Sequence, residues 1–279
     1  MIWFKQWMKS VLFIVTLTLL LINSSIFPIL KSCVDMFVYS QMHERESFLY
    51  EEEIQLQLQG GLATWEKDYF PFVIAFDASK AFSRYMGEPI DLTIYYNFGA
   101  FDLRQGASSL YNQNSPFYST FYGAYAIRYK DSEEIYGLRT DQKPDIEAIT
   151  KITDFDLKHL VYSSIGHIEP ELEYKIENNE EVMVIDGREF IVFDATIQMD
   201  GMWHEYERDY TAYIQYGKPP IQLGDKESFE AIEGFGRIYL HYDDIEGISY
   251  FFYIITADKE TLQYTEEAFI AKAKITKKH

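Results

Sequence analysis

The segment WHEYERDY, residues 203–210, holds the side chains whose types and spacing are best suited to chemistry. If the segment is a strand, Glu205, Glu207 and Asp209 share one face and His204 lies on the other. Three carboxylates in a row supply the oxygen ligands that Ca²⁺ binds, and His204 beside Glu205 would supply a general acid and base. The segment lacks the two-histidine spacing of the H-E-x-x-H motif. The simpler interpretation is a solvated strand face.

A second candidate for catalysis is His167, in GHIEPELEY, residues 166–174. Glu169 and Glu171 lie close to it in the sequence, and a histidine with a carboxylate is a common general acid–base pair. The Glu-Pro step at 169–170 interrupts regular structure, so the three groups converge only if the tertiary fold brings them together. Otherwise they line the rim of a loop.

The third candidate is HYDDIEG, residues 241–247, in which His241 is close to Asp243 and Asp244. Its spacing and length differ from those of an EF-hand loop. Carboxylates at a turn commonly accept hydrogen bonds from their own backbone, which is the alternative to a cation site. The sequence predicts no cofactor, with Ca²⁺ as the one alternative.

The segment SPFYSTFYGAYAIRY, residues 115–129, combines aromatic and small residues at strand spacing. Phe117 and Phe121 align on one face, while Tyr118 and Tyr122 face the other way. Aromatic residues on both faces indicate either a strand buried on both sides or one core face and an exposed platform. Such a platform, formed by Tyr118 and Tyr122, would bind an apolar or ring-bearing ligand, sugars included.

The charge balance limits the partners of the chain. It has 44 acidic and 25 basic residues, a formal net charge of −19. Binding to nucleic acid through phosphate contacts needs clustered Lys and Arg, so that class is excluded, and cations and basic partners are favoured. Cys33 is the only cysteine, so no internal disulfide forms and the core must stabilise the domain.

The first 30 residues predict a membrane anchor. Lys5 and Lys9 precede residues 11–30, which carry no charge, and about 20 apolar residues span the core of a bilayer. We expect residues 1–10 in the cytoplasm, residues 11–30 in the membrane and the remainder outside, because cytoplasmic flanks are rich in Lys and Arg. The alternatives are cleavage, which would secrete the protein, and lipidation at Cys33.

Two Asp-Gly pairs give the clearest local prediction. Asp186-Gly187 and Asp200-Gly201 each lie between alternating runs and predict a two-residue hairpin turn. Between them, Phe193 and its alternate neighbours predict a sheet that is covered on one side. Further strands are indicated by alternating or aromatic runs at residues 54–58, 71–77, 89–98, 118–130, 236–242 and 248–256.

Helices are predicted at three places. Residues 31–52 predict a juxtamembrane helix, residues 141–164 predict one or two short helices capped by Asp141 or Asp154, and residues 258–278 predict a C-terminal helix. The fold class is therefore α+β, with antiparallel β-meander sheets and a few helices after an N-terminal transmembrane helix. The extracytoplasmic domain covers residues 53–279, with 141–164 as a seam between two halves.

Three functional hypotheses follow, of which the third is a structural one: an assembly subunit whose juxtamembrane helix carries self-association. The first is a membrane-anchored, single-pass protein of bacterial type, whose outer domain binds a partner protein or an envelope component such as a glycan. The anchor and the acidic domain motivate it. The alternative is a secreted or anchored hydrolase that combines His167 or His204 with carboxylates, around a divalent cation or without one.

Overall fold

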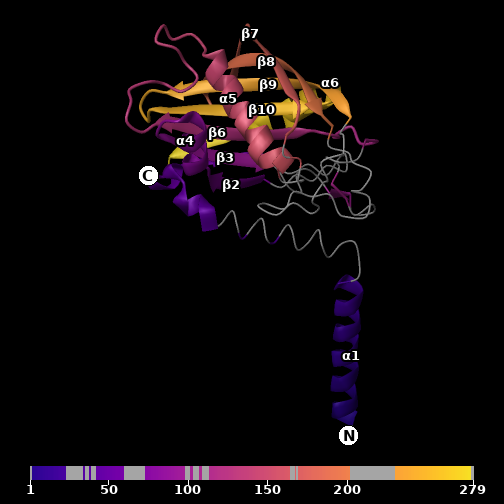
Figure 1. Ribbon diagram of the computed structural model, residues 1–279. Helices are drawn as coiled ribbons and strands as arrows, with labels where there is room; N and C mark the ends of the chain where they lie inside the picture. The colour runs from indigo at the N-terminus through magenta and orange to yellow at the C-terminus, as the bar shows by residue number, and fades with distance from the viewer. Residues whose placement is uncertain are drawn as a thin grey trace.

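The computed structural model describes residues 2–22, 34, 38, 42–59, 73–97, 101–102, 107–108, 113–163, 167, 169–201 and 230–277. Over this part of the chain the predicted α+β class is confirmed, because the sheets are antiparallel and the helices are few. The largest sheet has seven strands in the order β2-β3-β6-β10-β9-β8-β7 (Figure 1). In chain order they are β2 (Val73–Asp77), β3 (Ile90–Asn97), β6 (Phe121–Tyr129), β7 (Leu172–Ile185), β8 (Arg188–Asp200), β9 (Ala231–Asp243) and β10 (Ile248–Thr256).

The centre of the sheet joins the two halves of the chain. β6 precedes residues 141–164 and β10 follows them, yet the two strands are neighbours, with Phe121 opposite Ile255. All nine residues of β10 are buried, and so are the first seven of β6. Aromatic and β-branched side chains pack on both faces here, as in other sheets with two covered faces.

Each face of the sheet carries its own hydrophobic core. α5 (Ile146–Asp156) continues as the π-helix η4 (Leu157–Tyr162), and α5 lies across the front of the sheet in Figure 1. Elements from both ends of the chain cover the opposite face: α3 (Phe48–Glu51), β1 (Ile54–Gln57), α6 (Lys259–Ala268), η6 (Ile270–Lys272) and β11 (Lys274–Lys277). The prediction of one covered side is therefore wrong at Phe190 and Val192, which face this second core, while Phe193 faces the first. The remaining short elements are η1 (Glu44–Glu46), α4 (Ser79–Met86), β4 (Phe101–Asp102) and β5 (Ala107–Ser108).

One of the two Asp-Gly hairpins is confirmed. Asp186 and Gly187 have φ of 49° and 76° and connect β7 to β8, as a type I′ turn requires. The hairpin at Asp200-Gly201 is wrong, because β8 pairs instead with β9, with Asp200 opposite Ala231. The Gly201 amide donates to the Glu230 carbonyl at 2.8 Å, and the Asp200 side chain binds groups outside the hairpin.

The helix ends differ from the prediction in two places. Asp145 caps α5, with its carboxylate accepting from the amides of Glu147 and Ala148, so neither Asp141 nor Asp154 is the cap. The C-terminal helix ends early, and β11 pairs with β1. The reason is a strand pattern at the end of the chain, in which Ile275 is buried between exposed neighbours and lies opposite Leu56.

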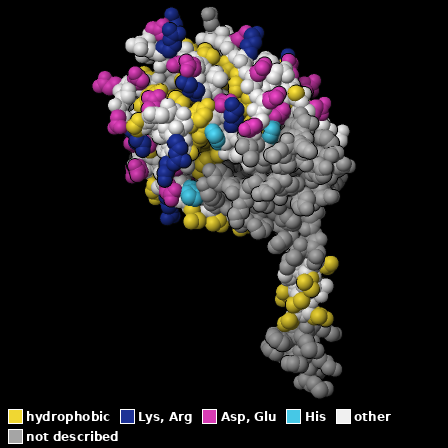
Figure 2. Space-filling view, in the orientation of Figure 1, with side chains coloured by type: hydrophobic (Ala, Val, Ile, Leu, Met, Phe, Trp, Pro, Cys, Tyr) yellow, Lys and Arg dark blue, Asp and Glu magenta, His cyan; other side chains and the backbone are white. Residues whose placement is uncertain are grey.

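The N-terminal helix α1 (Ile2–Ile22) leaves all of its described side chains, residues 10–20, exposed. Figure 2 shows hydrophobic side chains along this part of the helix. Among the described residues, no helix combines the length and the hydropathy that a membrane span needs. The predicted span, residues 11–30, extends past α1 into residues outside the described part of the chain.

Candidate functional site

His167 has a carboxylate partner, but not one of the two predicted. Its Nε2 lies 2.6 Å from Oδ2 of Asp200, at the end of β8, and the side chains are only 16% and 10% exposed. The same oxygen accepts from the Glu171 amide at 3.1 Å, and the Tyr162 hydroxyl donates to the Asp200 carbonyl at 2.5 Å. The Tyr162 ring meets the imidazole edge-on, with 5.5 Å between centroids.

This pair can act in two ways. A carboxylate that fixes the orientation of an imidazole is the arrangement used in general acid–base catalysis. The same contacts also fasten His167 and Glu171 to the sheet, because Asp200 binds the side chain of one and the backbone amide of the other. Glu169 is exposed, and Glu171 contributes its backbone amide rather than its exposed carboxylate. A turn was predicted at Asp200 instead, because Asp-Gly is a strong hairpin signal.

The other predicted chemical groups fall into two sets. His204, Glu205, Glu207, Asp209 and Cys33 lie outside the described residues. Asp243 caps its own turn, with its carboxylate accepting from the amides of Ile245 and Glu246 at 3.1 and 3.2 Å, and Asp244 is exposed. Within the described part of the chain, no three His, Cys, Asp or Glu side chains gather into a group that could hold a metal ion.

The aromatic strand β6 is buried on both faces. Tyr122 is fully buried, stacks on Phe269 at 4.6 Å and donates to the Gln59 carbonyl at 2.7 Å. Tyr118 is half-buried, and its hydroxyl lies against Gly201. An exposed platform requires both rings at the surface, so the two tyrosines do not form one. The cause is the central position of β6 between β3 and β10.

A buried carboxyl lies between α5 and the sheet. Asp156 is 1% exposed and accepts from the Tyr125 hydroxyl at 2.6 Å, and the Tyr125 ring stacks on Tyr253 at 4.9 Å. Burial raises the pKa of Asp156 to about 6, although the hydrogen bond from Tyr125 opposes the shift. Asp156 was not predicted, since helical spacing alone does not show that a carboxyl faces the core.

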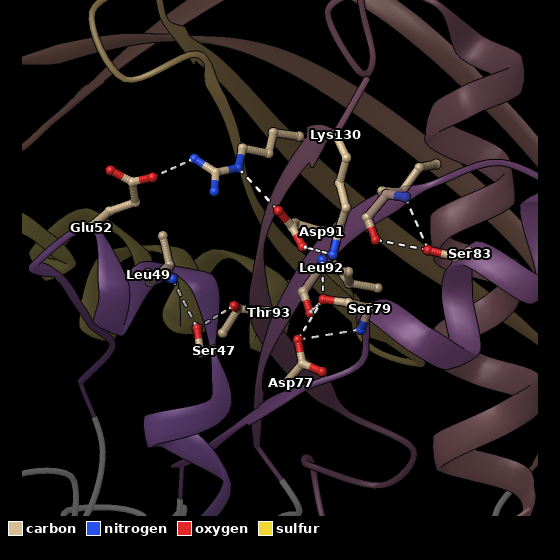
Figure 3. A network of polar contacts seen from close by, with 12 residues as sticks. Ser47, Leu49, Glu52, Asp77, Ser79, Ser83, Asp91, Leu92, Thr93 and Lys130 are labelled. Carbon is tan, nitrogen blue, oxygen red and sulfur yellow. Dashed lines mark hydrogen bonds and ion pairs between the residues drawn. The ribbon is translucent and has the colours of Figure 1, made fainter. Parts of the chain in front are cut away.

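The edge of the sheet at β3 is closed by serine hydroxyls (Figure 3). β2 pairs with β3 only as far as Thr93, and α4 crosses the edge beyond that point. Ser83 Oγ donates to the Ile90 carbonyl and accepts from the Ile90 amide, both at 2.9 Å. Ser79 Oγ accepts from the Leu92 amide at 3.0 Å and also bonds the Asp77 carboxylate. The hydroxyls thus replace a neighbouring strand.

A charged network holds the segment before β1 against the same edge (Figure 3). Arg128 on β6 binds Asp91 at 3.1 Å and Glu52 at 2.7 Å, and its guanidinium lies 4.7 Å from the centre of the Phe48 ring. Lys130 binds Asp91 at 2.8 Å. The network therefore ties α3, β3 and β6 together. Its signal in the sequence is weak, because it joins residues that are far apart.

The opposite edge, β7, has a different surface. It is 14 residues long with four glutamates and one lysine, and Ile185 is the one buried residue among its described side chains. Within the described part of the chain, β8 is the only strand that pairs with it. A register shift between Asn178 and Val182 interrupts the ladder. Among the described strands, the run from Leu172 to Glu177 is therefore a regular strand whose outer edge is unpaired.

Comparison with known proteins gives no match: no family model, no curated protein and no solved structure matches this chain.

Proposed function

We propose that the chain is a membrane-anchored extracytoplasmic protein whose domain binds a partner protein or an envelope component. The observation that carries the proposal is α1, which leaves its apolar side chains exposed, with Leu12 and Phe13 both at 67%. Apolar surface of this kind is stable when it is buried in another apolar medium, and residues 11–30 are long enough to reach across a bilayer.

The domain supports a binding role through its surface. The chain carries a net charge of −19, and the exposed strand β7 adds acidic side chains to a long strand edge. An exposed strand edge is a common recognition surface for another chain. The contacts of Glu52 and Phe48 with Arg128 hold residues 48–52 against the sheet, and these residues follow the proposed anchor in the chain.

Membrane partition and intact mass of the full-length protein, expressed in a bacterial host, test the anchor. We expect an uncleaved species in the membrane fraction. The variant Ile14→Lys with Leu17→Lys should leave that fraction, since each central lysine costs about 3 kcal/mol in a membrane helix. The matched control Val34→Lys with Val38→Lys should stay. A truncated soluble species would contradict the anchor. An added acyl mass at Cys33 would show that a lipid, rather than a transmembrane helix, holds the protein in the membrane.

A second candidate function is hydrolysis, favoured by the 2.6 Å contact between His167 and Asp200. It predicts turnover of cell-wall or peptide substrates that falls at least 100-fold in His167→Gln. The matched control is His241→Gln, whose imidazole bonds a backbone carbonyl on β8. Lack of turnover in the native protein, or equal loss in both variants, would contradict this function.

A further inference from the structure

The strand β7 offers two different faces along one exposed edge. Leu172, Tyr174 and Ile176 are half-buried and pack against the core beneath α5. Glu173 and Glu177 alternate with them on the other face and are exposed. The register with β8 confirms the alternation, because Tyr174 lies opposite the buried Ile197, whereas Glu173 lies opposite the exposed Gln198.

A strand added beside β7 would meet both faces at once. Its backbone would bond to the outward amides and carbonyls of β7, and its alternate side chains would lie beside apolar groups on one face and carboxylates on the other. Directly opposite side chains are about 5 Å apart across such a pair, which is close enough for ion pairs and apolar contacts.

From this pattern we infer that residues 172–177 of β7 bind an extended segment of a partner protein, in which apolar residues alternate with Lys or Arg. The inference rests on the proposed binding function and specifies its surface and its partner. The alternation follows from the two faces of β7, and the positive charge follows from Glu173 and Glu177. Lys175 already pairs with Glu177 at 2.8 Å, so the local balance stays negative.

A second copy of the chain fits this edge poorly. Antiparallel pairing of β7 with β7 would bring glutamates of one copy against those of the other, and like charges directly opposite each other are destabilising. Two copies of a chain of net charge −19 also repel each other at long range. The carboxylates that disfavour self-association are the groups that select a basic partner.

Titration of the full-length protein in detergent with fluorescent nine-residue peptides tests the inference. One peptide alternates Val and Lys, and a second has the same composition with the lysines grouped at one end. We expect the alternating peptide to bind at least tenfold more tightly, because only it places apolar and basic residues on separate faces of a strand. Equal binding of the two peptides, or no binding, would overturn the inference.

Two charge-reversal variants locate the site. Glu173→Lys with Glu177→Lys should weaken binding of the alternating peptide at least tenfold. Glu133→Lys with Glu134→Lys makes the same change in net charge in an exposed loop and should change the affinity less than twofold. Equal losses would mean that the peptide responds to overall charge, which would overturn the assignment to β7.

Photo-crosslinking in intact cells separates this inference from the proposed function. A crosslinking residue is placed at Lys175, at Glu133 or at the exposed Ile245. We expect a product from position 175 that maps to an alternating basic segment of another protein. A partner captured from 133 or 245 alone overturns the β7 site and leaves the binding function standing. No product from any position contradicts both, and a product between two copies contradicts the choice of partner.

Discussion

At one edge of the seven-stranded sheet, β2 pairs with β3 from Asn97 to Thr93, and hydroxyls of α4 bond the remaining backbone at Leu92 and Ile90. At the other edge, β7 is a long strand that leaves Val182 and Val184 58% and 63% exposed. Exposed strand edges promote association, and natural proteins usually cover or charge them. The two edges use these two devices separately, since hydroxyls of α4 bond the β3 backbone beyond β2, whereas acidic side chains line β7.

The largest effect is expected from opening the closed edge. Ser79→Ala with Ser83→Ala removes the partners of backbone groups at Ile90 and Leu92, and each unsatisfied buried group costs about 1–3 kcal/mol. We expect the free energy of unfolding to fall by about 3 kcal/mol in urea denaturation. The control is Ser132→Ala, whose hydroxyl accepts from an exposed amide. A loss no greater than that of the control would show that the hydroxyls do not close this edge.

Ionisation of a carboxyl in the core beneath the centre of the sheet should change the stability of the whole domain rather than that of one edge. The carboxyl of Asp156 ionises near pH 3.8 in the unfolded chain and near 6 in the folded protein. Its contribution is therefore greatest below pH 3.8 and is lost as pH rises to about 6, a difference of about 3 kcal/mol. Tyr125, which faces it, stays protonated there because burial raises its pKa.

Asp156→Asn removes this titration while it keeps the shape of the side chain. Between pH 4 and 7, the native protein should lose about 2 kcal/mol of unfolding free energy relative to the variant. Urea denaturation at each pH gives the difference, and Asp141→Asn at the exposed ion pair with Lys143 is the matched control. Parallel pH curves for the native protein and Asp156→Asn would contradict the raised pKa.

A smaller effect is expected from the charged network at the closed edge. Arg128→Gln breaks the contacts with Asp91 and Glu52, and the variant should lose about 1–2 kcal/mol because Asp91 is nearly buried and keeps Lys130 as a partner. Arg139→Gln, at a 62% exposed side chain, should change stability by less than about 0.5 kcal/mol. Thermal denaturation of both variants measures this difference. Equal shifts in melting temperature would show that the network does not stabilise this edge.

The smallest effect on folding is expected at the open edge. Glu173→Gln with Glu177→Gln should leave the free energy of unfolding within about 0.5 kcal/mol of the native value, because exposed ion pairs contribute little. The same variant should bind the alternating Val-Lys peptide more weakly. Loss of stability comparable to that of the serine variant would mean that these carboxylates support the fold rather than recognition.

The sequence predicted those parts of the fold that depend on local pattern. The alternation in β1 and the turn at Asp186-Gly187 are confirmed, since both depend on neighbouring residues. The same Asp-Gly signal failed at Asp200, where the aspartate binds His167, 33 residues away. Such pairings depend on the tertiary fold, and the periodicity of the sequence does not show which distant residues the fold brings together.

The closed edge could have been found in part from the sequence. Ser79 and Ser83 are four residues apart on one face of a short helix directly after a short strand, a pattern that suits hydroxyl contacts with the next strand. The open edge could not, because strand order decides which strand lies outermost. Burial of Tyr122 has the same cause, since only the position of β6 in the sheet covers both of its faces.

Amide hydrogen exchange at the two edges, in the full-length protein with and without the alternating Val-Lys peptide, tests the difference most directly. We predict slow exchange at Ile90 and Leu92 in both samples, because the serine hydroxyls hold these amides. Alternate amides of residues 172–177 should exchange fast in the free protein and at least tenfold more slowly with the peptide. Slow exchange at β7 without the peptide, or equal protection of both edges by it, would contradict an open edge that receives a partner strand.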